Sequence, residues 1–255
     1  GAWTPLGRAG ETQFTVDRLV VTGNGVVAGP RENLTIVANN VEVRDGARLT
    51  HRGATDTTAY SLVMTIAGAL LVDAESSIDV SGRGYYDGRT SGNTTAGATT
   101  GYSVGSYGGL GHAKDGSANW TYGDYRDPVE PGSGGAGHHG SVTPGGGLVR
   151  ISAQTAQLDG RIQARGADGR NGPYGEDEGA GSGGGIRLDV GVLTGSGWIT
   201  ADGGNGDSGA NTGSGGGGRV AVYYDDMSGF GVTHVTAHGG SGGAGAGAVG
   251  TVYLK

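Results

Sequence analysis

From residue 148 onward the chain contains one pattern three times, at residues 148–169, 186–206 and 220–242. Each copy begins with a short apolar alternation, passes through a small turn, makes a second β-rich run and ends in glycine. A final apolar run at 251–254 opens a fourth copy. Repetition at a period of tens of residues is typical of solenoids and arrays, so this feature constrains the fold more than any single motif does.

The N-terminal part of the chain fits the same repeat unit. Residues 14–27, 34–53 and 62–82 contain short β-rich runs separated by Asn, Asp and Gly, which favour turns. No stretch has the apolar i, i+3, i+4 spacing of a helix. The sequence therefore predicts an all-β fold, namely a right-handed parallel β-helix (solenoid) of about six to seven rungs. We expect it to form a single domain over residues 1–255.

A β-sandwich is the main alternative, because it also uses short strands at regular intervals. The β-helix is favoured because three short strands recur together as a triplet, with a glycine-rich arm at the same phase. Rungs stacked at ~4.8 Å would make a core about 30 Å long. Aliphatic side chains that point inward would form ladders along its axis, and we expect these to be Ile36, Val43, Leu49, Ile66, Leu71, Ile78, Ile151, Leu158, Ile162, Leu188, Leu193, Ile199, Val222 and Val235.

Glycine dominates the composition, with 60 residues against 6 prolines. The absence of a Gly-X-Y period excludes collagen, and the Val, Ile and Leu alternations argue against a disordered chain. The glycine-rich arms at 132–147, 179–185, 213–218 and 239–250 recur at one phase. We therefore predict that they stack beside each other in an ordered, polyglycine-II-like layer packed against the β-helix.

Charge and cysteine content exclude several classes of function. The chain has no cysteine and a formal net charge of −7, which excludes disulfides and thiolate metal sites and argues against nucleic acid as a partner. No run of 18 apolar residues and no charged-then-apolar leader is present. The sequence therefore predicts a mature or excised soluble segment without membrane insertion.

Two segments depart from the repeat. Residues 1–13 have no periodicity and are expected to cap the β-helix, with Trp3 covering the first rung. Residues 85–147 are too long for a rung corner, and seven of the sixteen aromatic residues of the chain lie within them. Loops of this length are usually functional or disordered, and the aromatic content favours an ordered, functional loop.

Several glycine motifs carry a family resemblance. The strings at 107–112 and 122–125, the Pro-Gly-Ser-Gly-Gly at 131–135, and the Gly-Gly-Gly before the next apolar run resemble glycine-rich modules of large bacterial surface and secreted proteins. The resemblance covers roughly residues 30–255. It implies a right-handed parallel β-helix, an extracellular or cell-surface location, and linkage to other domains of a larger chain. It implies no catalytic residue.

The aromatic loop suggests sugar recognition, because Trp and Tyr faces stack on pyranose rings while Asp and Arg hydrogen-bond the hydroxyl groups. We expect a non-catalytic, glycan-binding or adhesive module whose partner is a polysaccharide or a cell-surface glycan. One alternative is a polysaccharide lyase or hydrolase with its site in 107–130, where Asp124, Arg126, Asp127 and Glu130 lie near Trp120 in the sequence. Others are a purely structural stalk, and aromatics that only pack the loop. The predicted ligand-binding residues are Tyr102, Tyr107, Trp120, Tyr122, Asp124, Tyr125, Arg126 and Asp127.

Calcium is the one metal that the sequence suggests. Asp168 and Asp207 lie on tight glycine turns, with the acidic run 176–178 close to Asp168 in the sequence, and supply hard oxygen ligands. Solvated acidic corners are the alternative reading. His112 and the pair at 138–139 lack diagnostic spacing. The serine-containing strings at 101–105 and 206–209 lack the strand and helix context of a nucleophile.

Overall fold

The computed structural model describes residues 3–113, 116–137, 143–171, 177–207 and 212–255. It is an all-β structure in which two parallel sheets contain most of the strands. The all-β prediction with parallel strands is confirmed. No helix within these described ranges is long and apolar enough to cross a membrane.

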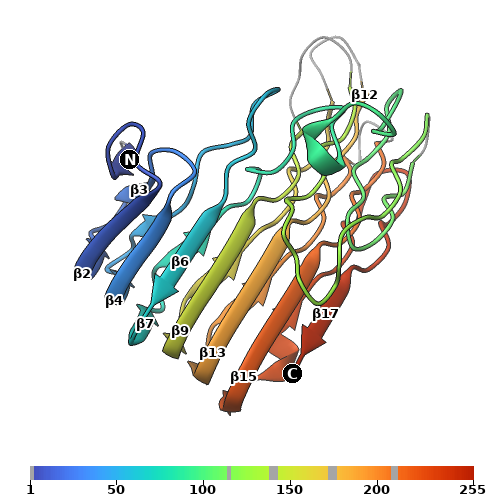
Figure 1. Cartoon of the computed structure of the whole chain (residues 1–255). Helices are drawn as coiled ribbons and strands as arrows, with labels where there is room; N and C mark the ends of the chain where they lie inside the picture. Colours follow the sequence, from blue (N-terminus) through green and yellow to red (C-terminus); the bar gives the residue numbers. More distant parts are fainter. Residues whose placement is uncertain (1–2, 114–115, 138–142, 172–176, 208–211) are drawn as a thin grey trace.

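The larger sheet has eight strands, and all of its neighbouring pairs are parallel. Figure 1 shows them side by side in chain order from the N-terminal to the C-terminal end. One level of the sheet is shared by two short strands, β6 and β7, which both pair with β4 and β9. The strands are β2 (Gln13–Thr22), β4 (Thr35–Arg44), β6 (Leu62–Ile66), β7 (Ala69–Val72), β9 (Leu148–Leu158), β13 (Gly185–Gly195), β15 (Arg219–Phe230) and β17 (Thr251–Leu254).

The smaller sheet has seven short strands, and these alternate along the chain with those of the larger sheet. Besides the two sheets, the chain forms the antiparallel pair β11 (Arg170–Asn171) and β12 (Asp177–Glu178), and the 3₁₀ turns η1 (Ser91–Asn93) and η2 (Val232–His234). The strands of the smaller sheet are β1 (Trp3–Leu6), β3 (Val27–Pro30), β5 (Arg48–Leu49), β8 (Ser77–Asp79), β10 (Arg161–Gln163), β14 (Trp198–Thr200) and β16 (Val235–Thr236). Trp3 therefore lies in the edge strand of this sheet, paired with Val27.

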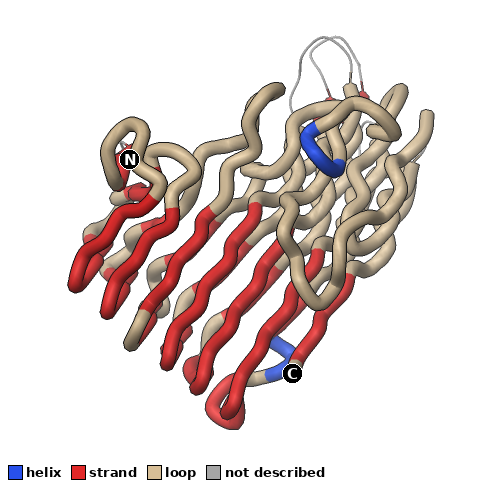
Figure 2. Tube along the Cα trace, in the orientation of Figure 1, coloured by secondary structure: helices blue, strands red, loops and turns tan. Residues whose placement is uncertain are grey.

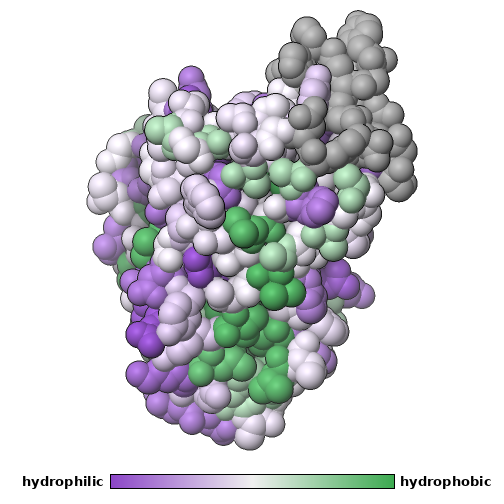
Figure 3. Space-filling model, turned by 90° about the vertical axis from the view of Figure 1, so that its right-hand side faces the viewer, coloured by the Kyte–Doolittle hydropathy of each residue, from purple (hydrophilic) through white to green (hydrophobic). Residues whose placement is uncertain are grey.

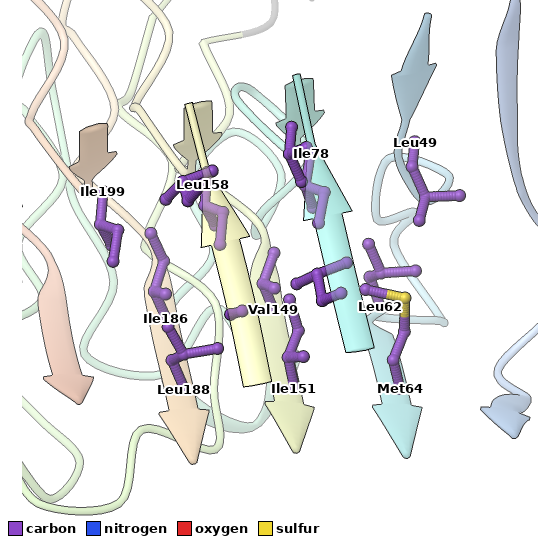
Figure 4. Close-up of a cluster of buried hydrophobic side chains, with 14 of the residues drawn as sticks. Leu49, Leu62, Met64, Ile78, Val149, Ile151, Leu158, Ile186, Leu188 and Ile199 are labelled. Carbon is purple, nitrogen blue, oxygen red and sulfur yellow. The ribbon is translucent and has the colours of Figure 1, made fainter. Parts of the chain in front are cut away.

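The core consists of aliphatic ladders between the two sheets (Figure 4). Ile36, Met64, Ile151, Leu188 and Val222 occupy one row of the larger sheet, and each is at most 2% exposed. Parallel pairing without a register shift places these equivalent side chains directly above one another. The apolar alternation of each copy therefore becomes continuous buried surface.

Of the predicted inward residues, Leu71 is wrong. It is half-buried, whereas its neighbours Leu70 and Val72 are 1% and 0% exposed. Side chains alternate between the two faces of a strand, so an error of one residue moves the whole strand to the opposite face. The run Ala-Leu-Leu-Val at 69–72 is apolar at every position, and the sequence gives no pattern to choose between the faces. The other thirteen residues are buried.

The glycine-rich arms lie beside one another at one end of the strands, where Figure 2 shows loops that continue from the larger sheet. Gly183 N–H donates to the carbonyl of Gly216 at 2.9 Å, and Gly217 N–H donates to that of Ala248 at 2.9 Å. A Cβ on Gly184 would lie 2.1 Å from the carbonyl oxygen of Gly147, and a Cβ on Gly218 would lie 2.1 Å from that of Gly184. Only glycine permits this approach.

The long segment 85–147 packs along these arms. Gly105 N–H donates to the carbonyl of Ala180 at 2.9 Å, and Gly108 N–H donates to that of Gly217 at 3.0 Å. At the far end, Ala248 N–H donates to the carbonyl of Leu110 at 2.8 Å. Backbone hydrogen bonds to successive repeat units thus fix the described part of the segment, and this fixed path carries the aromatic loop toward the C-terminal strands.

Candidate functional site

The exposed part of the aromatic loop begins at a buried amide. Asn119 is 2% exposed, and its Oδ1 accepts a hydrogen bond from Ser106 N–H at 2.8 Å. Its Nδ2 donates toward the carbonyl oxygens of Ser106 and Trp120, each at 2.9 Å. The next side chain, Trp120, is 83% exposed. The hydrogen bonds of Asn119 therefore fix the backbone beside a large apolar ring that is exposed to solvent, as a ligand-stacking ring requires.

Two of the predicted stacking residues serve a different purpose. Tyr107 is 0% exposed, and its ring centroid lies 4.7 Å from that of Tyr122. Tyr122 Oη donates to the carbonyl of Pro131 at 2.7 Å, and burial raises the pKa of both phenols. The guanidinium carbon of Arg219, on β15, lies 5.3 Å from the Tyr107 ring. These rings fasten the loop to the larger sheet, with Tyr107 buried and Tyr122 half-buried.

Beyond Tyr122 the loop crosses the outer face of the larger sheet and completes an aromatic patch formed by Tyr125, Tyr223 and Tyr253. The Tyr125 and Tyr253 rings meet edge to face at 5.6 Å, and the Tyr223 and Tyr253 centroids lie 5.7 Å apart. Arg126 places its guanidinium carbon 4.9 Å from the Tyr125 centroid. Tyr223 Oη donates to the carbonyl of Arg126 at 3.0 Å, which fixes the loop to β15.

An ionic row formed by Asp127, Arg150, Arg187 and Asp189 borders the aromatic patch. The pairing of β9 with β13 sets Arg150 beside Arg187, and Asp127 Oδ1 accepts from Nη1 of both at 2.7 Å. The hydrogen bond from Arg150 is the main cause that holds the pKa of Asp127 below its usual value. Asp189 accepts from Arg187 Nε and Nη2 at 2.7 and 3.2 Å. Loop and sheet are thus joined by a bridging carboxylate.

Two surface hollows flank Asp189 on this face. One has a volume of about 460 Å³, with Tyr223, Asp189 and the terminal Lys255 among the lining residues. The other, of about 180 Å³, is lined on its polar side by Arg150, Arg187, Asp189 and Ser152. Both are shallow, and each combines aromatic or aliphatic side chains with charged and hydroxyl groups.

The structure thus brings three predicted residues together, Tyr125, Arg126 and Asp127, at the edge of this surface. Asp124 is exposed and accepts from Arg126 N–H at 2.8 Å, whereas Tyr102 is half-buried elsewhere in the loop. Sequence reasoning missed Arg150, Arg187, Tyr223 and Tyr253. The repeat held the signal, because Arg150, Arg187 and Tyr253 occupy equivalent, outward positions of their copies.

The calcium hypothesis for Asp168 and Asp207 stays a prediction. Asp168 Oδ1 accepts from Arg165 Nη2 and from Asn205 N–H, both at 2.7 Å. Asp207 N–H donates to Thr212 Oγ1 at 2.6 Å. Within the described ranges no group of three or more His, Asp and Glu side chains could hold a metal ion. His138, His139 and Glu176 lie outside the described residues.

The half-buried Asp87 and the buried Glu178 form an acidic pair that the sequence did not suggest. Glu178 is 2% exposed and packs against Gly137. A Cβ added to Gly137 would lie 2.9 Å from Glu178 Cγ. Burial, and then the negative Glu178, raise the pKa of Asp87 to about 7. A carboxyl with a raised pKa can act as a general acid in glycoside hydrolysis, but Asp87 lies apart from the aromatic patch and the ionic row in the described contacts. We assign the pair no catalytic role.

Comparison of the chain with protein-family models, with curated proteins and with solved structures finds no match. The site therefore has to be interpreted from its own geometry.

Proposed function

We propose that the chain is a non-catalytic glycan-binding module, and that an extracellular or cell-surface polysaccharide lies across the outer face of the larger sheet. The observation that carries this proposal is Trp120, which is 83% exposed next to the 2% exposed Asn119. The same loop ends on the aromatic patch and the ionic row. Exposed rings and charged groups that already pair with one another suit a neutral or mixed-charge sugar chain, which offers pyranose faces and hydroxyl groups.

The architecture that we propose for this module is a right-handed parallel β-helix with a polyglycine-II-like layer along one side. Two features support it. Each C-terminal copy supplies one strand to the larger and one to the smaller sheet, and the glycine arms of successive copies bond to each other through their backbones. A module of this kind would present its binding face at a fixed position in a larger surface protein.

The charges of the site argue for binding over hydrolysis. Asp127 is held ionised by two arginines, which lower its pKa, so it is a poor general acid near neutral pH. Glu130, another carboxylate of the hydrolase hypothesis, accepts hydrogen bonds from Tyr85 Oη, Ser91 Oγ and Gly92 N–H at 2.7 to 2.9 Å. These hydrogen bonds join the beginning of the long segment, at residues 85–92, to residue 130.

The test is a glycan array, followed by calorimetric titration of any sugar that binds. Loss of one stacking ring should raise the Kd about fivefold or more, because an aromatic contact of this kind is worth about 1 kcal/mol or more with its buried area. We expect this for Trp120→Ala and Tyr125→Ala. Trp198→Ala is the matched control, since Trp198 is 42% exposed on the smaller sheet.

Failure of the wild-type chain to bind any glycan would refute the proposal and favour a structural stalk. Unchanged binding by Trp120→Ala would mean that the ligand does not contact the exposed ring of the aromatic loop. Release of unsaturated or reducing sugar ends from a bound polysaccharide would favour the lyase or hydrolase alternative.

A further inference from the structure

The outer face of the smaller sheet carries a pocket of about 370 Å³ with three arginines in its lining. Parallel pairing of β1, β3 and β5 places Trp3, Val27 and Arg48 in one row. Leu49, the residue after Arg48, is 0% exposed in the core, so side-chain alternation turns this row outward. The lining residues are Trp3, Val27, Arg48, Arg52, Gly53 and Arg83.

Two loops bring the other arginines to this row. Arg52 follows β5, and Arg83 follows β8. Ala54 N–H donates to the carbonyl of Arg83 at 3.2 Å, which joins the two loops, and a Cβ added to Gly53 would lie 3.9 Å from Arg83 Cδ. Burial, and then the positive charge of Arg48, lower the pKa of the half-buried Arg83. Three segments of the chain thus set three guanidinium groups around one pocket.

The hydrogen-bond donors of these three side chains are unused within the part of the chain that the structure describes. Arg48 Nη1 lies 3.8 Å from Asp79 Oδ2, which is beyond hydrogen-bond distance. Arg48 Nε and Trp3 Nε1 are buried donors without a partner. The arginines of the ionic row, by contrast, donate to Asp127 at 2.7 Å. The pocket therefore holds positive charge and donors that Asp79 does not satisfy.

This local charge differs from that of the rest of the molecule. The formal net charge of the chain is −7, so a group of cations does not follow from the composition. Figure 3 shows the side of the molecule beside β17, where apolar side chains gather among hydrophilic ones. The pocket lies toward the other end of the sheets, on β1, β3 and β5. An anion is therefore attracted to this part of the surface.

We propose that this pocket binds the carboxylate or sulfate group of an acidic saccharide. The planar donor fork of arginine matches the oxygens of such a group, and the pocket supplies three forks from different segments. Trp3 adds an aromatic ring beside the charges, as a sugar ring requires. The pocket is on the smaller sheet, so it is separate from the aromatic patch and the ionic row and does not depend on the function proposed for them.

The experiment is calorimetric titration of the whole chain, at constant ionic strength, with tetragalacturonate and with a sulfated carrageenan tetrasaccharide. Fully methyl-esterified tetragalacturonate is the uncharged control ligand. We expect Arg48→Gln and Arg83→Gln each to raise the Kd about tenfold or more, which is the usual worth of a hydrogen bond to a charged group. Arg18→Gln is the control variant and should change the Kd less than about twofold, since Arg18 is exposed on the larger sheet and pairs with Glu42.

Binding of either charged oligosaccharide that is lost in the arginine variants supports the proposal, and the one that binds identifies the anionic group. Failure of both to bind the wild type would overturn it, and so would equal binding of the methyl ester. Trp120→Ala should bind the charged ligand as the wild type does. Weaker binding by that variant, with unchanged binding by Arg48→Gln, would place the ligand on the larger sheet and overturn the assignment. Circular dichroism checks folding, and Arg52→Gln, at an exposed position, replaces either arginine variant that does not fold.

Discussion

Protonation of His51 should destabilise the folded chain. Its imidazole is fully buried between the end of β5 and the start of β9. Leu148 N–H donates to Nε2 at 3.3 Å, so the proton is on Nδ1, which donates to the carbonyl of Arg52 at 2.6 Å. Gly147 packs directly against the ring, and a Cβ added to it would lie 2.4 Å from Nε2. The site has room for a neutral ring, and none of the described residues offers a carboxylate to a charged one.

The magnitude follows from the shift in pKa. Burial is the main cause that lowers the pKa of His51 from 6.5 to about 4, and nearby Arg83 lowers it further. The folded pKa is depressed, so between pH 6.5 and 4 the unfolded chain binds the proton and the folded chain does not. The free energy of unfolding therefore falls as the pH falls. Each unit of pKa corresponds to about 1.4 kcal/mol, so the loss reaches about 3 kcal/mol near pH 4.

The assay is denaturant unfolding of the wild type and of His51→Gln at intervals between pH 7 and pH 4. Glutamine can accept from Leu148 and donate to Arg52, but it does not titrate in this range. The difference between the two free energies isolates His51, because every other group titrates in both chains. We expect the difference to change by about 3 kcal/mol over the range, in favour of the variant at low pH. His238→Gln, at an exposed position, serves as the control.

A difference that stays flat with pH would refute the reasoning, since it would mean that His51 titrates alike in the folded and unfolded chains. An equal change in the His238 variant would show that the effect is not specific to the buried ring.

Three further predictions concern other buried features. Asp87→Asn should stabilise the chain more at pH 8 than at pH 5. The pKa of Asp87 is raised to about 7, and only the ionised carboxylate carries the cost of burial beside Glu178. Unfolding curves at the two pH values measure this, and equal effects at both would contradict it. Gly184→Ala should lower the free energy of unfolding by about 3 kcal/mol or more, measured by thermal unfolding, since its Cβ would lie 2.1 Å from the Gly147 carbonyl oxygen. Gly53→Ala is the control and should have little effect, because the nearest neighbour of its Cβ would lie at 3.9 Å. Asn119→Ala should lower the free energy of unfolding by about 1 to 3 kcal/mol, because it leaves the buried Ser106 amide unpaired. It should also make Trp120 more mobile, which fluorescence anisotropy would detect, with Ser117→Ala as the control.

The sequence by itself determined the elements of this protein. Strand positions and most inward residues follow from alternation with a period of two, which is a local property of each strand. The glycine arms follow from their recurrence at one phase, and close backbone approach explains why positions such as Gly184 and Gly218 require glycine. Leu71 shows the limit of the pattern, because an apolar run without alternation does not specify its face.

The tertiary structure alone decided which side chains share a surface. Tyr125 contacts Tyr253 across more than a hundred residues of chain, and Asp127 joins two arginines from different copies of the repeat. Such neighbours depend on strand register and on where a long loop comes to rest. The same applies to Tyr107, which has the same residue type as Tyr125 but is 0% exposed, and to His51, whose burial depends on Leu148 from a distant strand. Local pattern fixes how a residue faces on its own strand, whereas the energy of its contacts depends on partners that only the assembled sheets bring to it.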